Sequence, residues 1–115
     1  MIKRLEVGPR MSQAVVHGST IYLAGQVADD TSADVAGQTR QVLASIYRLL
    51  AAAGSDKTRI LAATVYLADI GSFAAMNSAW DAWVAKGHAP ARATVEAALA
   101  TPAYQVEIVV VAAAD

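Results

Sequence analysis

Two charged residues in otherwise apolar segments are the first candidates for chemistry in this chain. Arg92 lies within Pro90–Ala97, and Glu107 lies between Val106 and Ile108; both neighbourhoods read as β-strands. A charge buried among apolar groups is costly unless it is paired or binds a ligand. Either the two residues form a salt bridge that fixes the register of two strands, or they hold a small anionic substrate.

The immediate surroundings of Arg92 favour a ligand. Small residues leave room around its side chain, namely Ala91, Ala93 and the pair Ala97-Ala98, and Pro90 rigidifies the chain that leads to it. A guanidinium presents a planar fork that suits bidentate binding of a carboxylate. The spacing of these residues does not exclude the salt bridge, so both interpretations stay open at this point.

The strand geometry predicts where these side chains point. Side chains alternate along a strand, so Arg92 and Thr94 share one face of theirs. A short turn around Pro102 predicts that this strand and the last one are antiparallel neighbours. On that basis Arg92 and Glu107 could approach one another.

Length and composition predict a single domain over residues 1–115. Apolar residues make up 56% of the chain, but no apolar run approaches the roughly 20 residues that a membrane-spanning helix needs. The first residues carry two charges and no apolar stretch, unlike a signal peptide. We therefore expect no membrane partner and a cytoplasmic location.

Charge and residue usage exclude several kinds of site. The net charge is −1, with nine basic and ten acidic residues and no basic stripe, so we expect no nucleic-acid partner. The chain has no cysteine, which removes disulfides and thiolate nucleophiles. Its two histidines, His17 and His88, lack metal-ligand spacing, and we expect no bound metal.

Hydrophobic periodicity predicts an α+β fold with the element order β-β-β-α-β-α-β-β. The expected strands cover residues 2–7, 14–17, 20–25, 59–67, 93–97 and 105–113. A first helix is expected from about residue 34 to Gly54, and a second from the capping residue Ser72 to Gly87. Right-handed crossovers would place both helices on the same face of one sheet.

The two helices are expected to be amphipathic. The first should bury Val35, Thr39, Val42, Leu43, Ile46, Leu49, Leu50 and Ala53 and expose Gln38, Gln41, Ser45 and Arg48. The second has Phe73, Met76, Trp80, Trp83 and Val84 on one face. That spacing favours core or interface packing of the two tryptophans over a ligand wall.

The last strand predicts that the chain does not act alone. Val106, Ile108 and Val110 lie on one face, whereas Val109 and Val111 lie on the other. Strands that are apolar on both faces normally have both faces covered, and the chain offers helices for only one. A second copy of the chain is the simplest cover, so we expect a homo-oligomer.

The motifs together resemble the RidA (YjgF) family of reactive intermediate deaminases over essentially the whole chain. The matching segments are Gly8-Pro9, Ser12-Gln13-Ala14, Ala24-Gly25-Gln26, Phe73 to Trp83 with Asn77, Pro90 to Glu96, and Val106-Glu107-Ile108. The second helix and its continuation, Gly87 to Pro90, are more similar to the YoaB-like branch than to RidA itself.

This resemblance implies a chorismate-mutase-like fold, with one mixed sheet and two helices on one face, assembled as a homotrimer with clefts between subunits. It implies hydrolysis of reactive enamines and imines, such as 2-aminoacrylate, to 2-keto acids and ammonia, without a cofactor. The substrate would be a small carboxylate. Such a reaction is plausible because an imine carbon is already electrophilic, so orientation and one proton shuttle could suffice.

The resemblance also implies roles for individual residues. Arg92 would bind the substrate carboxylate, and Glu107 would position the attacking water and move its proton. The backbone of Gly25 and the side chain of Thr94, where many relatives have cysteine, would line the cleft. Asn77 would add a hydrogen bond or support the wall.

Two departures from the family pattern concern the substrate. Arg10 stands where relatives usually have tyrosine, and Ala24 stands where they usually have serine. Arg10 would either favour a second anionic group in the cleft or be a solvated loop residue. Two other functions stay open: a trimer that binds small carboxylates or acts as a chaperone without turnover, and an endoribonuclease, which fits poorly with the near-neutral charge.

Overall fold

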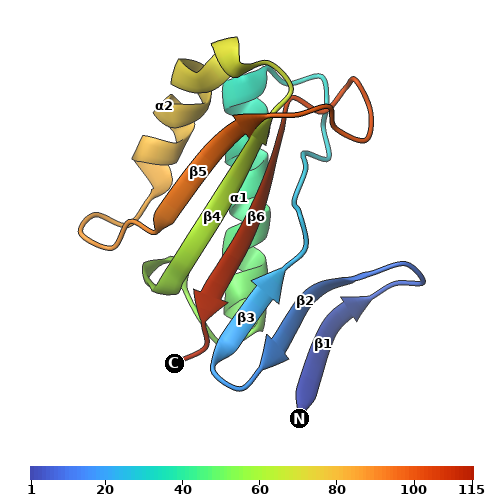
Figure 1. Ribbon diagram of the computed structural model, residues 1–115, viewed down its shortest axis with the longest axis vertical. Coiled ribbons are helices and arrows are strands. Elements are labelled where there is room, and N and C mark those ends of the chain that lie inside the picture. Colours follow the sequence, from blue (N-terminus) through green and yellow to red (C-terminus); the bar gives the residue numbers. More distant parts are fainter.

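The computed structural model describes residues 1–115 and contains one six-stranded sheet and two α-helices (Figure 1). The strands are β1 (Ile2–Val7), β2 (Ser12–His17), β3 (Thr20–Leu23), β4 (Ile60–Leu67), β5 (Ala91–Glu96) and β6 (Val106–Ala113). The helices are α1 (Val35–Ala52) and α2 (Phe73–Trp83), and two short 3-10 turns cover Lys57–Arg59 and Ile70–Ser72. The predicted α+β class and order of elements are confirmed.

The sheet is mixed, with the strand order β1-β2-β3-β6-β4-β5. Only β4 and β5 are parallel; every other neighbouring pair is antiparallel. Both helices lie behind the sheet in the view of Figure 1, and the front face carries no element. The prediction of two helices on one face is therefore confirmed. Neither helix combines the length and the apolarity that crossing a bilayer demands.

The predicted pairing of the Arg92 strand with the last strand is wrong, because β4 lies between them. Ala63 of β4 pairs with Arg92 on one side and with Val110 on the other. The connection through α2 returns β5 parallel to β4 at the outer edge, which leaves the inner edge of β4 for β6. The segment around Pro102 is consequently no hairpin turn but a loop that crosses the end of β4.

The same register places Arg92 and Glu107 on opposite faces of the sheet. Val110 shares the row of Arg92 and is buried beneath the helices. Glu107 lies three residues from Val110, so its side chain points to the other face. No ion pair joins Arg92 and Glu107, and the salt-bridge interpretation of these two charges is wrong.

The core lies between the helices and the rear face of the sheet. Side chains of α1, including Leu43, Ile46 and Leu49, are fully or almost fully buried with Val65 and Ile108 of the sheet. The other face of β6 presents half-buried Glu107, Val109 and Val111. The strand β6 is therefore apolar on both faces, but in a single chain only the face toward the helices is covered.

Helix boundaries follow the predicted capping signals in part. Asp34 caps α1 by accepting a hydrogen bond from the Gly37 N–H, and Gly54 follows the helix with a positive φ of 84°. The second helix ends at Trp83 rather than at the predicted Gly87. Ser72 makes no side-chain capping hydrogen bond to α2, because its hydroxyl donates to the Asp69 carbonyl instead.

Gln38 was expected on the exposed face of the first helix, and this prediction is wrong. Its side chain is fully buried. Its Nε2 lies 3.1 to 3.3 Å from the carbonyl oxygens of Thr31, Ala33 and Ala103, and its Oε1 accepts from the Gln105 N–H at 2.9 Å. An amide that satisfies both its donor and its acceptor atoms can be buried at little cost, so a polar residue occupies a core position.

We predict that Gln38→Leu lowers the free energy of unfolding by about 2–4 kcal/mol, because the N–H of half-buried Gln105 and three carbonyls lose their partner. Gln41→Leu is the matched control on the same helix, since the Gln41 amide bonds only the exposed backbone of Asp30. It should cost less than about 1 kcal/mol. Urea unfolding at one fixed protein concentration measures both; equal costs would contradict the role given to Gln38.

Candidate functional site

Arg92 lies on the edge strand β5 and is half-buried against α2. Its Nη1 donates to Asn77 Oδ1 at 2.8 Å, and its guanidinium carbon lies 5.0 Å from the Trp80 ring centroid and 5.8 Å from that of Phe73. Phe73, Asn77 and Trp80 are four and three residues apart, which places them along one side of the helix. The helix thus presents an aromatic and amide surface to the arginine.

All partners of Arg92 within the chain are neutral. No carboxylate lies within 4 Å of it, and only Met76 Sδ, at 3.9 Å from Nη1, joins the Asn77 contact. A guanidinium has five N–H donors, so most of its hydrogen-bonding capacity remains free. Neutral partners fix the orientation of the group without neutralising its charge, an arrangement suited to an anionic ligand.

Thr94 shares the helix-facing side of β5 with Arg92. Its Oγ1 is the only buried side-chain oxygen or nitrogen in the chain without a hydrogen-bond partner. A buried hydroxyl without a partner is costly. The Thr94 hydroxyl can therefore still form a hydrogen bond with a ligand held by Arg92. We call Arg92, Thr94, Asn77, Trp80 and Phe73 the Arg92 cluster.

Glu107 lies on the opposite face of the sheet and contacts Gly25. The chain following β3 joins β6 through a bridge in which Gln26 and Ile108 exchange backbone hydrogen bonds of 2.9 and 3.1 Å. A Cβ atom at Gly25 would lie 2.9 Å from Cδ of Glu107, closer than such atoms approach. Glycine is therefore needed at this position for the carboxylate to occupy its place.

Gly25 and Glu107 line a cavity of about 550 Å³, which we call the Glu107 cavity. Its other lining residues are mainly polar and include Glu6, Gln13, Gln26, Asp29, Ser45, Arg48 and Tyr104. Gln26 is held in place because its Nε2 donates to Gln13 Oε1 and to the Ala24 carbonyl, both at 2.9 Å. No cation lies within 4 Å of the Glu107 carboxylate, so this charge also lacks a partner.

Glu6 and Arg48 form an exposed ion pair in the wall of the Glu107 cavity. Arg48 Nη1 donates to Glu6 Oε2 at 2.6 Å. This hydrogen bond lowers the pKa of Glu6 and raises the pKa of Arg48. The only arginine that lines the cavity is thus already paired.

The structure divides the predicted site residues into two groups. Arg92, Thr94 and Asn77 lie together on the helix side of the sheet, whereas Gly25 and Glu107 lie together on the open side. Arg10 belongs to neither group, since it is exposed in the loop between β1 and β2 and does not line the Glu107 cavity.

Sequence reasoning missed Tyr104 as a site residue. It lies in the loop that leads into β6 and lines the Glu107 cavity. The one feature of the sequence that could have identified Tyr104 is its position, three residues before Glu107. No group of three or more histidine, aspartate or glutamate side chains is placed to hold a metal ion.

Comparison with known proteins assigns the chain to a family. A family model described as Endoribonuclease L-PSP matches residues 1–114. The chain belongs to this YjgF/RidA family. It is 50% identical over 112 residues to the RutC family protein YoaB of Escherichia coli K12, covering 97% of both proteins. The predicted family and its YoaB-like branch are confirmed.

Two further family members extend the comparison. A crystal structure of a YjgF family protein from Neisseria meningitidis superposes with a TM-score of 0.98 at 47% identity, over all of this chain and 96% of the other. The human protein named 2-iminobutanoate/2-iminopropanoate deaminase is 37% identical over 112 residues, covering 92% of this chain and 80% of that protein. The YjgF fold is thus common to the chain and its solved relative.

We predict that Gly25→Ala displaces the Glu107 carboxylate while the fold persists. The added methyl group meets the end of a flexible side chain, so the free energy of unfolding should fall by less than about 1 kcal/mol. Gly8→Ala is the control, because its Cβ would meet its nearest neighbour, the Met11 carbonyl, at 3.4 Å. Crystal structures of both variants check this; an unmoved Glu107 in Gly25→Ala would refute it.

Proposed function

We propose that this protein hydrolyses reactive 2-imino acids and their enamine tautomers to 2-keto acids and ammonia. One observation carries the proposal: Arg92 and Glu107 are charges without a charged partner, oriented by neutral neighbours and set on opposite faces of one chain. The human relative named as a 2-iminobutanoate/2-iminopropanoate deaminase supports the same reaction class.

We propose further that the site is completed between the subunits of a homotrimer. A single chain cannot offer Arg92 and Glu107 to one small molecule, because the sheet lies between them. The open face of the sheet supports an oligomer, since it carries the apolar side chains Tyr22, Tyr66, Val95, Val109 and Val111. Because Arg92 lies on the edge strand β5, we propose that packing of this face against other copies places the Arg92 cluster of one subunit beside the Glu107 cavity of the next.

Substrate binding begins at the arginine. The free N–H groups of Arg92 bind the substrate carboxylate as a fork, while Asn77 and Trp80 hold the guanidinium in its plane. The unpaired Thr94 hydroxyl adds a donor or acceptor on the same face. Fixing the carboxylate directs the adjacent C=N group toward the neighbouring subunit, where orientation lowers the barrier to attack.

Glu107 then acts on the water and on the tetrahedral intermediate. The water oxygen bonds to the imine carbon, the π electrons move to nitrogen, and the nitrogen takes up a proton from solvent. Glu107 accepts a proton from the attacking water and returns one to the amino group. The C–N bond breaks, ammonia leaves, and the remaining hydroxyl loses its proton to solvent to give the 2-keto acid, so the protons taken up and released are equal. No cofactor takes part.

We predict that Arg92→Gln and Glu107→Gln each lower kcat/KM for imino-acid hydrolysis by about 100-fold or more, since one removes carboxylate binding and the other the proton shuttle. Arg59→Gln, at an exposed arginine outside both groups, is the control and should match wild type. Ammonia release from imines generated in situ by an amino-acid oxidase measures all three.

Two results would overturn the assignment. Equal rates for wild type and Arg92→Gln on a broad imine panel would exclude deaminase activity at this site. Calorimetric binding of a 2-keto acid that is lost in Arg92→Gln, without any acceleration of hydrolysis by wild type, would select a carboxylate-binding protein without turnover. RNA cleavage is not proposed, because the net charge is −1 and no basic stripe is present.

We predict that co-expressed Arg92→Gln and Glu107→Gln chains recover activity together. Every mixed trimer contains one junction at which both side chains are intact, so random assembly restores about a quarter of the wild-type rate. Light scattering should give three times the chain mass of 11.9 kDa. Failure to recover activity in mixed trimers would show that Arg92 and Glu107 do not act across a subunit boundary.

A further inference from the structure

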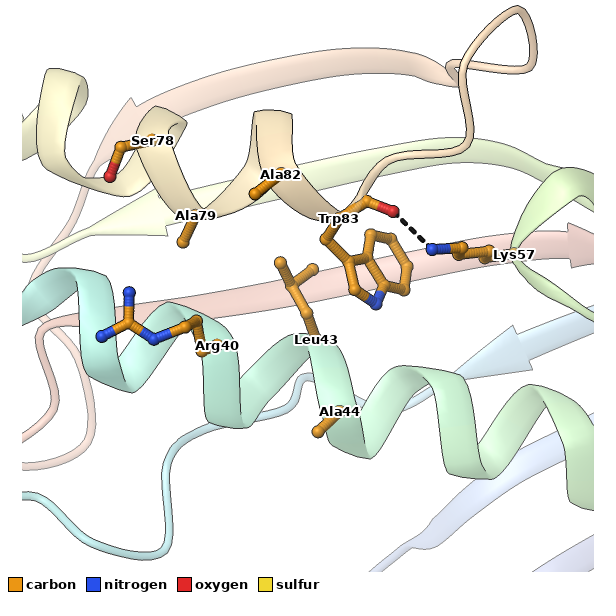
Figure 2. A pocket seen from close by; sticks show the side chains of 8 residues that line it. All are labelled: Arg40, Leu43, Ala44, Lys57, Ser78, Ala79, Ala82 and Trp83. Carbon is orange, nitrogen blue, oxygen red and sulfur yellow. Dashed lines mark hydrogen bonds between the residues drawn. The ribbon is translucent and has the colours of Figure 1, made fainter.

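A second cavity lies on the helix side of the molecule, between α1 and α2. It has a volume of about 320 Å³. Its apolar lining consists of Leu43, Ala44, Ala79, Ala82 and Trp83 (Figure 2). We call it the interhelical groove. It shares no residue with the Arg92 cluster or the Glu107 cavity, and the proposed trimer covers the opposite face of the sheet.

Two cations mark the ends of the interhelical groove. Figure 2 shows Arg40 at one end and Lys57 at the other, with Leu43 and Trp83 between them. No aspartate or glutamate lines the groove, and neither cation lies within 4 Å of a carboxylate. The groove therefore combines an apolar floor with two cations that form no ion pair.

The two cations differ in what they can still bind. Lys57 Nζ donates to the Trp83 carbonyl at 2.6 Å and lies 5.2 Å from the centre of the Trp83 ring. It is thereby fixed at the end of α2 and supports the tryptophan wall. Arg40 is exposed and donates no hydrogen bond within the chain, so its whole planar fork is free for a carboxylate.

We propose that the interhelical groove is a binding site for a small amphipathic carboxylate with an aryl or short alkyl body. The carboxylate pairs with Arg40, and the apolar body lies along Leu43 and Ala79 toward the Trp83 ring. The volume is at the lower end of the range for small-molecule pockets, which fits a ligand of this size rather than a peptide helix. This site is independent of the proposed deaminase site.

The test uses 3-phenylpropionate as the probe and the full-length Arg92→Ala chain as the background. That background removes the Arg92 cluster as a competing carboxylate site. Arg4 and Arg10 also lack an ion pair, so the groove variants described next separate binding in the groove from binding at those arginines. We expect saturable binding with a Kd of about 1 mM, typical of a ligand with so few atoms. Isothermal calorimetry measures the Kd, and Trp83 at the groove wall provides a fluorescence change as a second readout.

Variants of exposed residues locate the site. Arg40→Gln should raise the Kd at least about fivefold, since it removes a charge-assisted pair. The neutral amide 3-phenylpropanamide should bind the chain that keeps Arg40 more weakly than the carboxylate does, by a similar factor. Ala82→Phe, at an exposed helical position, fills the groove and should abolish binding. Lys3→Gln, an exposed charge change on β1, is the matched control and should leave the Kd unchanged.

Several outcomes would overturn the proposal. Absence of saturable binding up to about ten times the expected Kd excludes the site. Binding that survives both Arg40→Gln and Ala82→Phe places the ligand elsewhere on the chain. Equal affinity for the amide shows that the groove does not recognise the carboxylate. Circular dichroism and the Tm of each variant establish that the fold is intact, so that every result bears on the groove.

Discussion

The pairing of β4 on both of its edges is the constraint on which the candidate site depends. It places the parallel strand β5 on one side and the antiparallel strand β6 on the other. With Ala63 opposite both Arg92 and Val110, the side-chain alternation of the sheet turns Arg92 and Glu107 to different faces. Two charges that would neutralise each other as neighbours are thereby kept apart, and each remains available to a ligand.

Each of these charges is oriented by groups that do not cancel it. Arg92 rests on Trp80 and bonds the amide oxygen of Asn77, so its charge persists while its rotation is restricted. Glu107 rests against the Cα of Gly25, where any side chain would occupy its place. Side chains held in this way need little further ordering to bind a ligand, which agrees with the roles proposed for the two charges.

The two faces of the sheet are built for different contacts. The rear face is closed by α1 and α2, and the buried Gln38 ties α1 to the loop that precedes β6. The front face keeps valines and tyrosines half-buried or exposed and holds Glu107 among them. An apolar face with a polar cavity at its margin suits a subunit boundary, while the outer helix surface retains a separate groove with cations of its own.

Local patterns in the sequence determined the elements of this protein, because hydrophobic period and capping residues act over a few neighbouring positions. They also singled out Arg92 and Glu107 as candidate site residues, and they predicted the amphipathic α1. Strand order, the burial of Gln38 and the role of Tyr104 in the cavity were decided only by the tertiary structure. Strand pairing joins segments far apart in the chain, and the partners of a polar side chain depend on which distant backbone groups arrive beside it.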